Sequence, residues 1–207
     1  MDENGVIKKT TKVIMLRVIC VRTGDKFDSW YEDNLKYMVD KYSGLEYDEF
    51  VCIRDDVYED DYGTFNNLLM FERFKDGQNI FFDLDVVIKG DCNRFLTEEL
   101  HVCDSRRWQN DEYYKYNKLA SDIVSWSGDY SKIHRKIYEN LDYNYVKYHN
   151  GIDKYLYDEW NPKRYVNGFS SIQSMNYDFE NSAVVFFNGH YKTMRLKGWW
   201  NNYTLDP

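Results

Sequence analysis

The sequence predicts an α/β domain, built on a mixed, mostly parallel sheet that is flanked by helices. Between residues 13 and 88, short apolar runs rich in β-branched residues alternate with segments whose apolar residues recur at helical spacing. The order is strand, helix, strand, helix, strand, with turn residues between the elements. This alternation is typical of parallel strands joined by right-handed crossovers.

The individual elements follow from these patterns. We expect strands at 13–21, 50–53 and 80–88, and amphipathic helices at 28–42 and 64–74. The later elements are less regular: a short helix at 92–100, a strand at 121–126, helices at 131–141 and 151–160, and a last buried strand at 183–187. Residues 101–116 are polar and aromatic, and their pattern predicts no element.

The length and composition indicate one domain. The chain has 207 residues, two prolines and no Gly/Ser-rich tract that could serve as a linker. We place the domain at 12–198, between tails at 1–11 and 199–207. The net charge of −8 argues against general nucleic-acid binding. The 20 Tyr, 12 Phe and 6 Trp suit a sugar-handling protein or an AT-rich genome, and both explanations stay open.

The cysteines and the N-terminus indicate a cytoplasmic protein. Cys20, Cys52, Cys92 and Cys103 show no CxxC spacing, and we expect reduced thiols of an intracellular protein. The apolar stretch near the N-terminus is interrupted by Arg17, is too short to span a membrane and lacks the shape of a signal peptide. We therefore expect no transmembrane segment.

Two aspartates stand in the middle of the most apolar part of the chain. Asp83 and Asp85 flank Leu84 within residues 79–91, NIFFDLDVVIKGD. In one alternating strand they point to the same face, where two carboxylates repel each other. A bound Mg²⁺ or Mn²⁺ removes that repulsion, and both ions prefer oxygen ligands. The order of elements also places the pair at the carboxyl end of a strand, where ligands bind in open α/β sheets.

A second polar cluster follows the last predicted strand. Residues 188–192 read Asn-Gly-His-Tyr-Lys and come directly after the apolar run 183–187. The cluster combines hydrogen-bond donors, a flexible turn and a cation, which phosphate groups require. The sequence therefore predicts a phosphate site close to the carboxyl end of this strand.

These segments resemble those of the GT-A glycosyltransferases, particularly the small glycogenin-like and the phage and bacterial types. The stretch FFDLDVVIKGD is similar to their DxD metal site. Residues 62–71 resemble the helix before it, residues 117–126 the "N-x-S, then apolar run" segment, residues 148–156 the "G-x-D-Q" helix start, and residues 187–192 the closing "F-H-G-x-x-K-P". The resemblance covers residues 12–193 as an ordered set.

The resemblance implies a GT-A fold and a metal-dependent glycosyltransferase of the hexosyltransferase type. It implies transfer of a sugar from a nucleotide-sugar donor, most simply a UDP-sugar, to an unknown acceptor with Mn²⁺ or Mg²⁺. Asp83 and Asp85 are the implied metal ligands. Asn188 stands where the family has a metal-binding histidine, so either Asn188 or His190 completes the metal site.

The remaining implied roles concern the donor and the reaction. Gly189 and Lys192 are expected to contact the donor phosphates, and Asn117 and Ser121 to bind the donor. Asp153 is the expected catalytic residue, facing the sugar or the acceptor.

Two other functions stay open. Residues 81–88, FFDLDVVI, also resemble the first motif of haloacid-dehalogenase-like phosphatases, with Asp83 as nucleophile and Asp85 as acid/base. That motif normally opens its domain, whereas two strands precede it here, and no acidic pair follows 121–126. A catalytically degenerate nucleotide-sugar-binding protein is the third candidate. It is suggested by Asn188 and by Asn67, which stands where relatives often have lysine.

Overall fold

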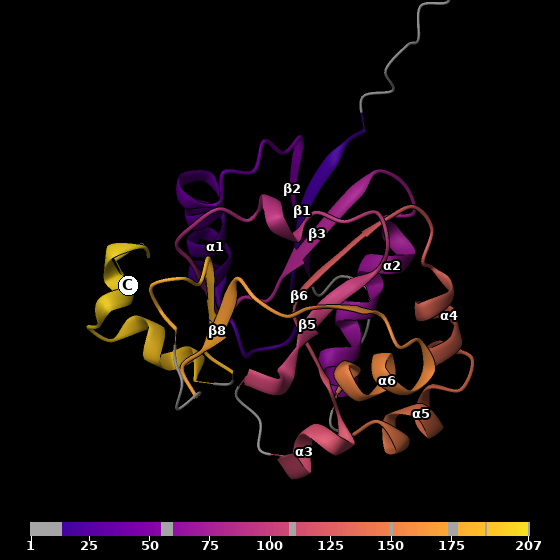
Figure 1. The fold of residues 1–207 in the computed structure, drawn as a ribbon. Helices are drawn as coiled ribbons and strands as arrows, with labels where there is room; N and C mark the ends of the chain where they lie inside the picture. The colour runs from indigo at the N-terminus through magenta and orange to yellow at the C-terminus, as the bar shows by residue number, and fades with distance from the viewer. Residues whose placement is uncertain are drawn as a thin grey trace, which may run out of the picture.

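The computed structural model describes residues 14–54, 60–107, 111–149, 151–173, 178–188 and 190–206. Within these residues the chain forms a six-stranded sheet, a three-stranded sheet and helices on both sides (Figure 1). The acidic stretch at 54–61 lies mostly outside the described residues. No helix in the described ranges has the length and apolar character that crossing a membrane requires.

The six-stranded sheet is mixed, with parallel pairs at both ends. β1 is parallel to β2 and to β3, and β5 is parallel to β7. β6 runs antiparallel to both β3 and β5. The sheet order is β2-β1-β3-β6-β5-β7, with β1 at Leu16–Arg22, β2 at Glu49–Arg54, β3 at Gln78–Phe82, β5 at His101–Asp104, β6 at Leu119–Ser127 and β7 at Lys163–Tyr165.

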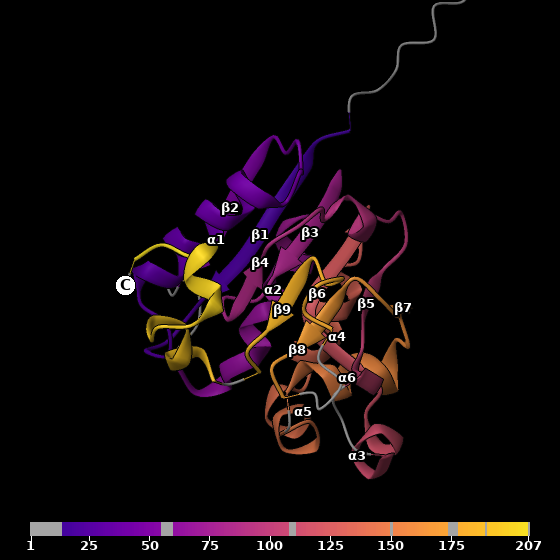
Figure 2. The same cartoon turned by 60° about the vertical axis from the view of Figure 1, so that its left-hand side comes forward.

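A smaller sheet covers part of one face of the larger one. It consists of β4 (Val86–Ile88), β9 (Val184–Phe186) and β8 (Phe169–Ser171), in the order β4-β9-β8. β9 is antiparallel to β4 and parallel to β8. Figure 2 shows β8 and β9 in front of β6. The apolar side chains of this small sheet share one core with β1, β3 and α1.

The larger sheet is buried on both faces, which explains its apolar strands. In β1, Val18 and Cys20 enter the core beneath α1, whereas Ile19 and Val21 enter the core on the opposite face. In Figure 1, α1 lies on the left of the sheet and the other helices lie on the right or below. Those helices are α2 (Leu69–Arg73), α3 (Asp111–Tyr116), α4 (Lys132–Tyr138), α5 (Leu141–Lys147) and α6 (Ile152–Glu159).

Helix α1 (Ser29–Tyr42) confirms the helix predicted at 28–42. The Asp28 side chain caps its first turn by accepting a hydrogen bond of 3.1 Å from the Trp30 N–H. Leu35 and Met38 are buried on the face that meets the sheet. The helix ends before Gly44, whose φ of +66° suits glycine.

The single strand predicted at 80–88 is wrong. β3 ends at Phe82 and β4 begins at Val86, in a different sheet. The Asp83 N–H still bonds the main sheet, at 2.9 Å from the Asp122 carbonyl oxygen, whereas the Asp85 carbonyl accepts from Phe187 of the small-sheet segment. The chain thus changes sheets at Leu84, and each aspartate follows the pairing of its own sheet.

Three predicted helices are shorter or divided. Residues 64–74 form the end of a 3₁₀ segment, Asp60–Leu68, and then α2. Residues 131–141 divide into α4 and the start of α5, because the backbone leaves the helical conformation at Asn140 (φ −148°, ψ 67°). Residues 92–100 contain only a 3₁₀ turn, Asn93–Phe95. The unassigned residues 101–116 contain β5 and α3.

The C-terminal residues pack along α1. Within 191–206 lie two 3₁₀ turns, Tyr191–Arg195 and Trp199–Asn202. The Tyr42 hydroxyl donates to the Asn202 carbonyl at 2.8 Å, and the Leu205 N–H donates to the Asn34 side chain at 2.8 Å. The domain limits of 12 and 198 stay predictions, but the described residues after 198 are held against the same core.

We predict that Leu84→Ala lowers the free energy of unfolding by about 2–5 kcal/mol, because the fully buried side chain leaves a cavity between the sheets. Urea unfolding followed by circular dichroism measures the change. Leu196, which is 62% exposed, provides the matched control. Leu196→Ala should change the same quantity by less than about 0.5 kcal/mol. Equal effects of the two substitutions contradict the anchoring role of Leu84.

Candidate active site

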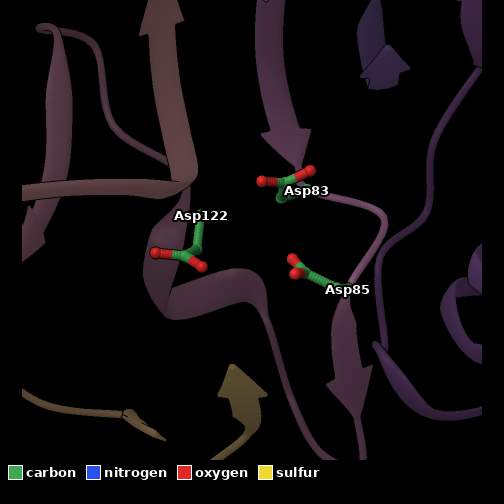
Figure 3. Close-up of side chains that lie close together, drawn as sticks. All are labelled: Asp83, Asp85 and Asp122. Carbon is green, nitrogen blue, oxygen red and sulfur yellow. The ribbon is translucent and has the colours of Figure 1, made fainter. Parts of the chain in front are cut away.

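Three aspartates from two sheets meet at one point. Asp83 follows β3, Asp85 precedes β4 and Asp122 lies within β6. One carboxylate oxygen from each lies within 4.8 Å of the others. Figure 3 shows the three side chains extending into a common space between the strand ends. Among the described residues this is the group of acidic, histidine and cysteine side chains that fits a metal ion.

The backbone fixes this arrangement. The antiparallel register of β3 and β6 pairs Phe82 with Ile123, which brings Asp122 next to Asp83. The Leu84 N–H donates to the Asp83 carboxylate at 2.8 Å. On the other side, the Phe187 N–H donates to the Asp85 carbonyl at 2.9 Å and ties that residue to the small sheet.

Burial and mutual repulsion raise the pKa of Asp83 and of Asp122. Burial, followed by the charge of Asp85, raises the pKa of Asp83 to about 7, while Lys26 opposes the rise. Burial, followed by the charges of Asp85 and Asp83, raises the pKa of Asp122 well above its ordinary value. Full ionisation of the cluster is therefore costly without a cation.

The aspartate cluster opens into a cavity of about 180 Å³. The cavity brings together most of the site residues predicted from the sequence: Asp83, Asp85, Ser121, Asp153 and Asn188. The residues that the sequence did not single out as functional in this cavity are Lys26, Asp122, Gly151 and Ile152. Asn67, the residue that departs from the family pattern, also lines it.

Asp153 is tied to Ser121. It lies in the first turn of α6, and its Oδ1 accepts a hydrogen bond of 2.9 Å from the Ser121 N–H. Burial raises the pKa of Asp153 to about 6, while hydrogen bonds from Ser121 oppose the rise. The predicted catalytic residue and a predicted donor-binding residue are thus direct neighbours on the cavity wall.

Asn188 lines the same cavity, but its side chain is engaged. The Ser171 hydroxyl donates to the Asn188 side-chain oxygen, and Gln173 Nε2 donates to the Asn188 carbonyl oxygen at 3.0 Å. Its φ of +45° is a conformation that asparagine adopts more readily than most residues. These contacts hold Asn188 in place, and the bond from Ser171 uses part of the capacity of the side-chain oxygen to accept hydrogen bonds.

Three other predicted residues, His190, Lys192 and Asn117, lie outside the lining of both cavities. His190 and Lys192 are exposed and line neither cavity. Asn117 is buried, and its side chain accepts a hydrogen bond of 3.1 Å from the Leu119 N–H, which shapes a local turn. Gly189 lies outside the described residues. The site roles expected for these four residues stay predictions.

A second cavity, of about 220 Å³, adjoins the first. It lies beyond the carboxyl end of β1, where Val21 and Phe27 contribute apolar surface. Lys26, Asn67 and Asp83 line both cavities, so together the two form one groove along the edge of the sheet. This is the edge at which ligands bind in α/β sheets.

Sequence reasoning missed Asp122 and Lys26. Asp122 lies inside the strand predicted at 121–126, and the signal was an acid directly before the apolar pair Ile123-Val124. That signal becomes informative only once β6 is known to run antiparallel beside β3. Lys26 lies in the loop after the first strand, where a charged residue is unremarkable in sequence.

Comparison with known proteins bears on the fold. No protein-family profile and no curated protein matches this chain. A glycosyltransferase involved in the glycosylation of the major capsid of PBCV-1 superposes with a TM-score of 0.63, at 11% identity over 86% of this chain and 99% of its own. Galactosyltransferase LgtC in complex with donor and acceptor sugar analogs gives 0.56, at 10% identity over 84% and 87%.

An active-site mutant of LgtC gives a TM-score of 0.58, at 11% identity over 84% of this chain and 87% of that one. Identities this low leave the fold as the common property. The chain has the GT-A glycosyltransferase-like fold that the DxD resemblance implied.

We predict that Asp83 and Asp153 make a contribution to the stability of the metal-free protein that is lost as pH rises from about 4 to about 7. The pKa of Asp83, about 7, and that of Asp153, about 6, lie above the ordinary value of 3.8, so the folded state keeps protons that the unfolded chain has released. This contribution is fully present below the ordinary pKa and is lost as pH passes the raised ones. Urea unfolding in EDTA at a series of pH values measures it.

The readout is the difference between wild type and Asp83→Asn, because Glu159 changes stability with the opposite sign. Hydrogen bonds, the largest from Lys136, lower the pKa of Glu159 to about 2. Asp83→Asn should flatten the loss between about pH 4 and pH 7. Asp33→Asn, at an exposed position on α1, serves as the control and should retain it. An unchanged pH profile in Asp83→Asn contradicts the prediction.

Proposed function

We propose that this protein is a metal-dependent glycosyltransferase. It moves a sugar, most simply a hexose from a UDP-sugar, to an acceptor that the cavities do not identify. The observation that carries the proposal is the cluster of Asp83, Asp85 and Asp122, which opens into a groove at the strand ends of a GT-A-type fold. The DxD resemblance and the groove point to the same donor class.

The residues present fit a divalent cation. Three carboxylates supply oxygen ligands within 4.8 Å of one another, and their mutual repulsion is relieved by positive charge. Asp83, Asp85 and Asp122 hold Mn²⁺ or Mg²⁺ in this proposal. The bound metal supplies Lewis-acid stabilisation to the departing nucleoside diphosphate.

Asp122 takes the place of the histidine that closes the metal site in the family. Asn188 is the alternative ligand, but its side-chain oxygen already accepts from the Ser171 hydroxyl. His190 is exposed and lies outside the cavity lining. Asp122, in contrast, belongs to the cluster itself. A carboxylate is also a stronger ligand for a hard cation than an amide oxygen.

The two cavities suggest how a donor lies. The cavity beyond β1 offers the apolar surface of Val21 and Phe27 and takes the nucleoside. The cavity at the aspartates takes the diphosphate and the sugar. Asp153 binds a hydroxyl group of the sugar or the acceptor there, because Ser121 already fixes one of its two carboxylate oxygens.

Two of the proteins with a similar fold bear on this proposal. LgtC is a galactosyltransferase that was crystallised with donor and acceptor sugar analogs, and the PBCV-1 protein acts in capsid glycosylation. A cytoplasmic location remains part of the proposal. It is consistent with the free thiols of Cys20, Cys52, Cys92 and Cys103.

The first test measures donor hydrolysis or transfer. We expect release of nucleoside diphosphate from one member of a panel of nucleotide sugars with MnCl₂, and its loss in EDTA. Asp85→Asn should reduce the rate by about 10²-fold or more, because the metal ion that would stabilise the leaving group is held less well. Asp33→Asn, on the exposed side of α1, should leave the rate unchanged.

The same assay separates the competing functions. Donor binding without turnover indicates a degenerate nucleotide-sugar-binding protein. Hydrolysis of p-nitrophenyl phosphate that Asp83→Asn abolishes indicates the phosphatase. If the protein neither binds nor turns over any nucleotide sugar, the glycosyltransferase proposal is rejected.

The second test concerns the third metal ligand. We expect Asp122→Asn to weaken Mn²⁺ binding, measured by isothermal titration calorimetry without donor, by about 10-fold or more. Asn188→Ala and His190→Ala should change the affinity less than Asp122→Asn does. A larger loss in either of these two variants assigns the third ligand to that residue.

A further inference from the structure

We propose that Lys26 is the residue that binds the diphosphate of the nucleotide donor, together with the metal. This inference rests on the proposed function and deepens it. Among the lysines and arginines of the described ranges, Lys26 is the one that lines both cavities. It stands at their junction, with Asn67 and Asp83.

The charge of the groove calls for a cation at this junction. The cavity at the cluster is lined by four aspartates, Asp83, Asp85, Asp122 and Asp153. A divalent cation offsets only part of their charge, and a nucleoside diphosphate brings further negative charge. Hydrogen bonds from an ammonium group to phosphate oxygens are among the strong charge-assisted contacts in proteins. Among the described lysines and arginines, Lys26 is the one placed to make such contacts with phosphate in both cavities.

Aromatic rings hold the Lys26 ammonium in place. Its Nζ lies 4.4 Å from the centroid of the Phe27 ring and 5.3 Å from that of Tyr191. The two rings contact each other edge to face at 5.0 Å, and Phe27 is buried. Such cation–π contacts restrict an otherwise flexible side chain. The ammonium is therefore partly positioned before any ligand binds.

Lys26 also lies close to the metal cluster, because it shares the lining of both cavities with Asp83. A diphosphate that contacts Lys26 is thus near the proposed metal as well. The Lys26 ammonium and the proposed metal ion would then both attract the diphosphate at the junction of the two cavities.

The inference competes with the assignment of the phosphate contact to Lys192. Lys192 is exposed, lines neither cavity, and its Nζ lies 5.9 Å from the centroid of the Tyr191 ring. The two lysines therefore approach the same ring, but only Lys26 reaches the groove lining. One experiment on both residues decides between them.

The experiment compares UDP and uridine as probes, with MnCl₂ present and GDP run in parallel. Isothermal titration calorimetry gives the affinity of the diphosphates, and NMR chemical shifts follow the weaker nucleoside. We expect Lys26→Gln to weaken UDP binding by about 10-fold and to reduce its salt dependence. Uridine, which has no phosphate, should bind with unchanged affinity. Lys26→Arg should retain most of the UDP affinity.

Lys132→Gln is the matched control. Lys132 is an exposed lysine on α4 that lines neither cavity, so the same loss of charge should leave UDP affinity unchanged. Circular dichroism verifies that each variant is folded. Because Lys26 is exposed, we expect its variants to fold like the wild type.

The outcomes separate this inference from the function on which it rests. UDP binding that Lys26→Gln leaves unchanged, or that Lys192→Gln weakens more strongly, overturns the inference and leaves the glycosyltransferase proposal intact. An equal loss of uridine affinity shows that Lys26 acts on the cavity as a whole, and also overturns it. A wild-type protein that binds no nucleoside diphosphate overturns both.

Discussion

The change of sheet at Leu84 is the constraint on which the site depends. Up to Asp83 the backbone pairs with β6, and from Asp85 onward it pairs with the segment around Phe187. Leu84 is fully buried between these pairings, so the two aspartates are fixed relative to each other. Two carboxylates that repel each other are thereby held together by the packing of one apolar side chain and by hydrogen bonds of two different sheets.

The charges of the aspartate cluster then determine which kind of ligand this geometry favours. Asp122 adds a third carboxylate, and burial leaves each group poorly solvated. A folded chain that keeps such a cluster either holds protons there, as the raised pKa of Asp83 indicates, or exchanges them for a cation. Lys26 lies at the point where the cluster cavity meets the second cavity. The groove thus combines an aspartate cluster that fits a metal ion with the positioned ammonium of Lys26, and this combination suits a diphosphate.

The C-terminal segment supports the same groove from outside the sheet. Arg195 forms an ion pair with Asp28, the residue that caps α1. The Tyr31 hydroxyl of α1 donates to the Tyr191 carbonyl oxygen at 3.2 Å. Tyr191 in turn presents its ring to Lys26. Residues far apart in the chain thus meet beside the site, and the packing of this segment on α1 determines where its ring lies.

The sequence by itself determined the fold class, most of the early elements and the two aspartates of the DxD stretch. Periods of 2 and 3.6 residues are local properties, and they placed β1, α1, β2 and α6 to within a few residues. Only the tertiary structure decided that residues 80–88 divide between two sheets and that β6 runs antiparallel beside β3. It also brought Asp122 and Lys26 to the groove. Strand pairing and loop position depend on contacts between distant segments, which no local pattern encodes.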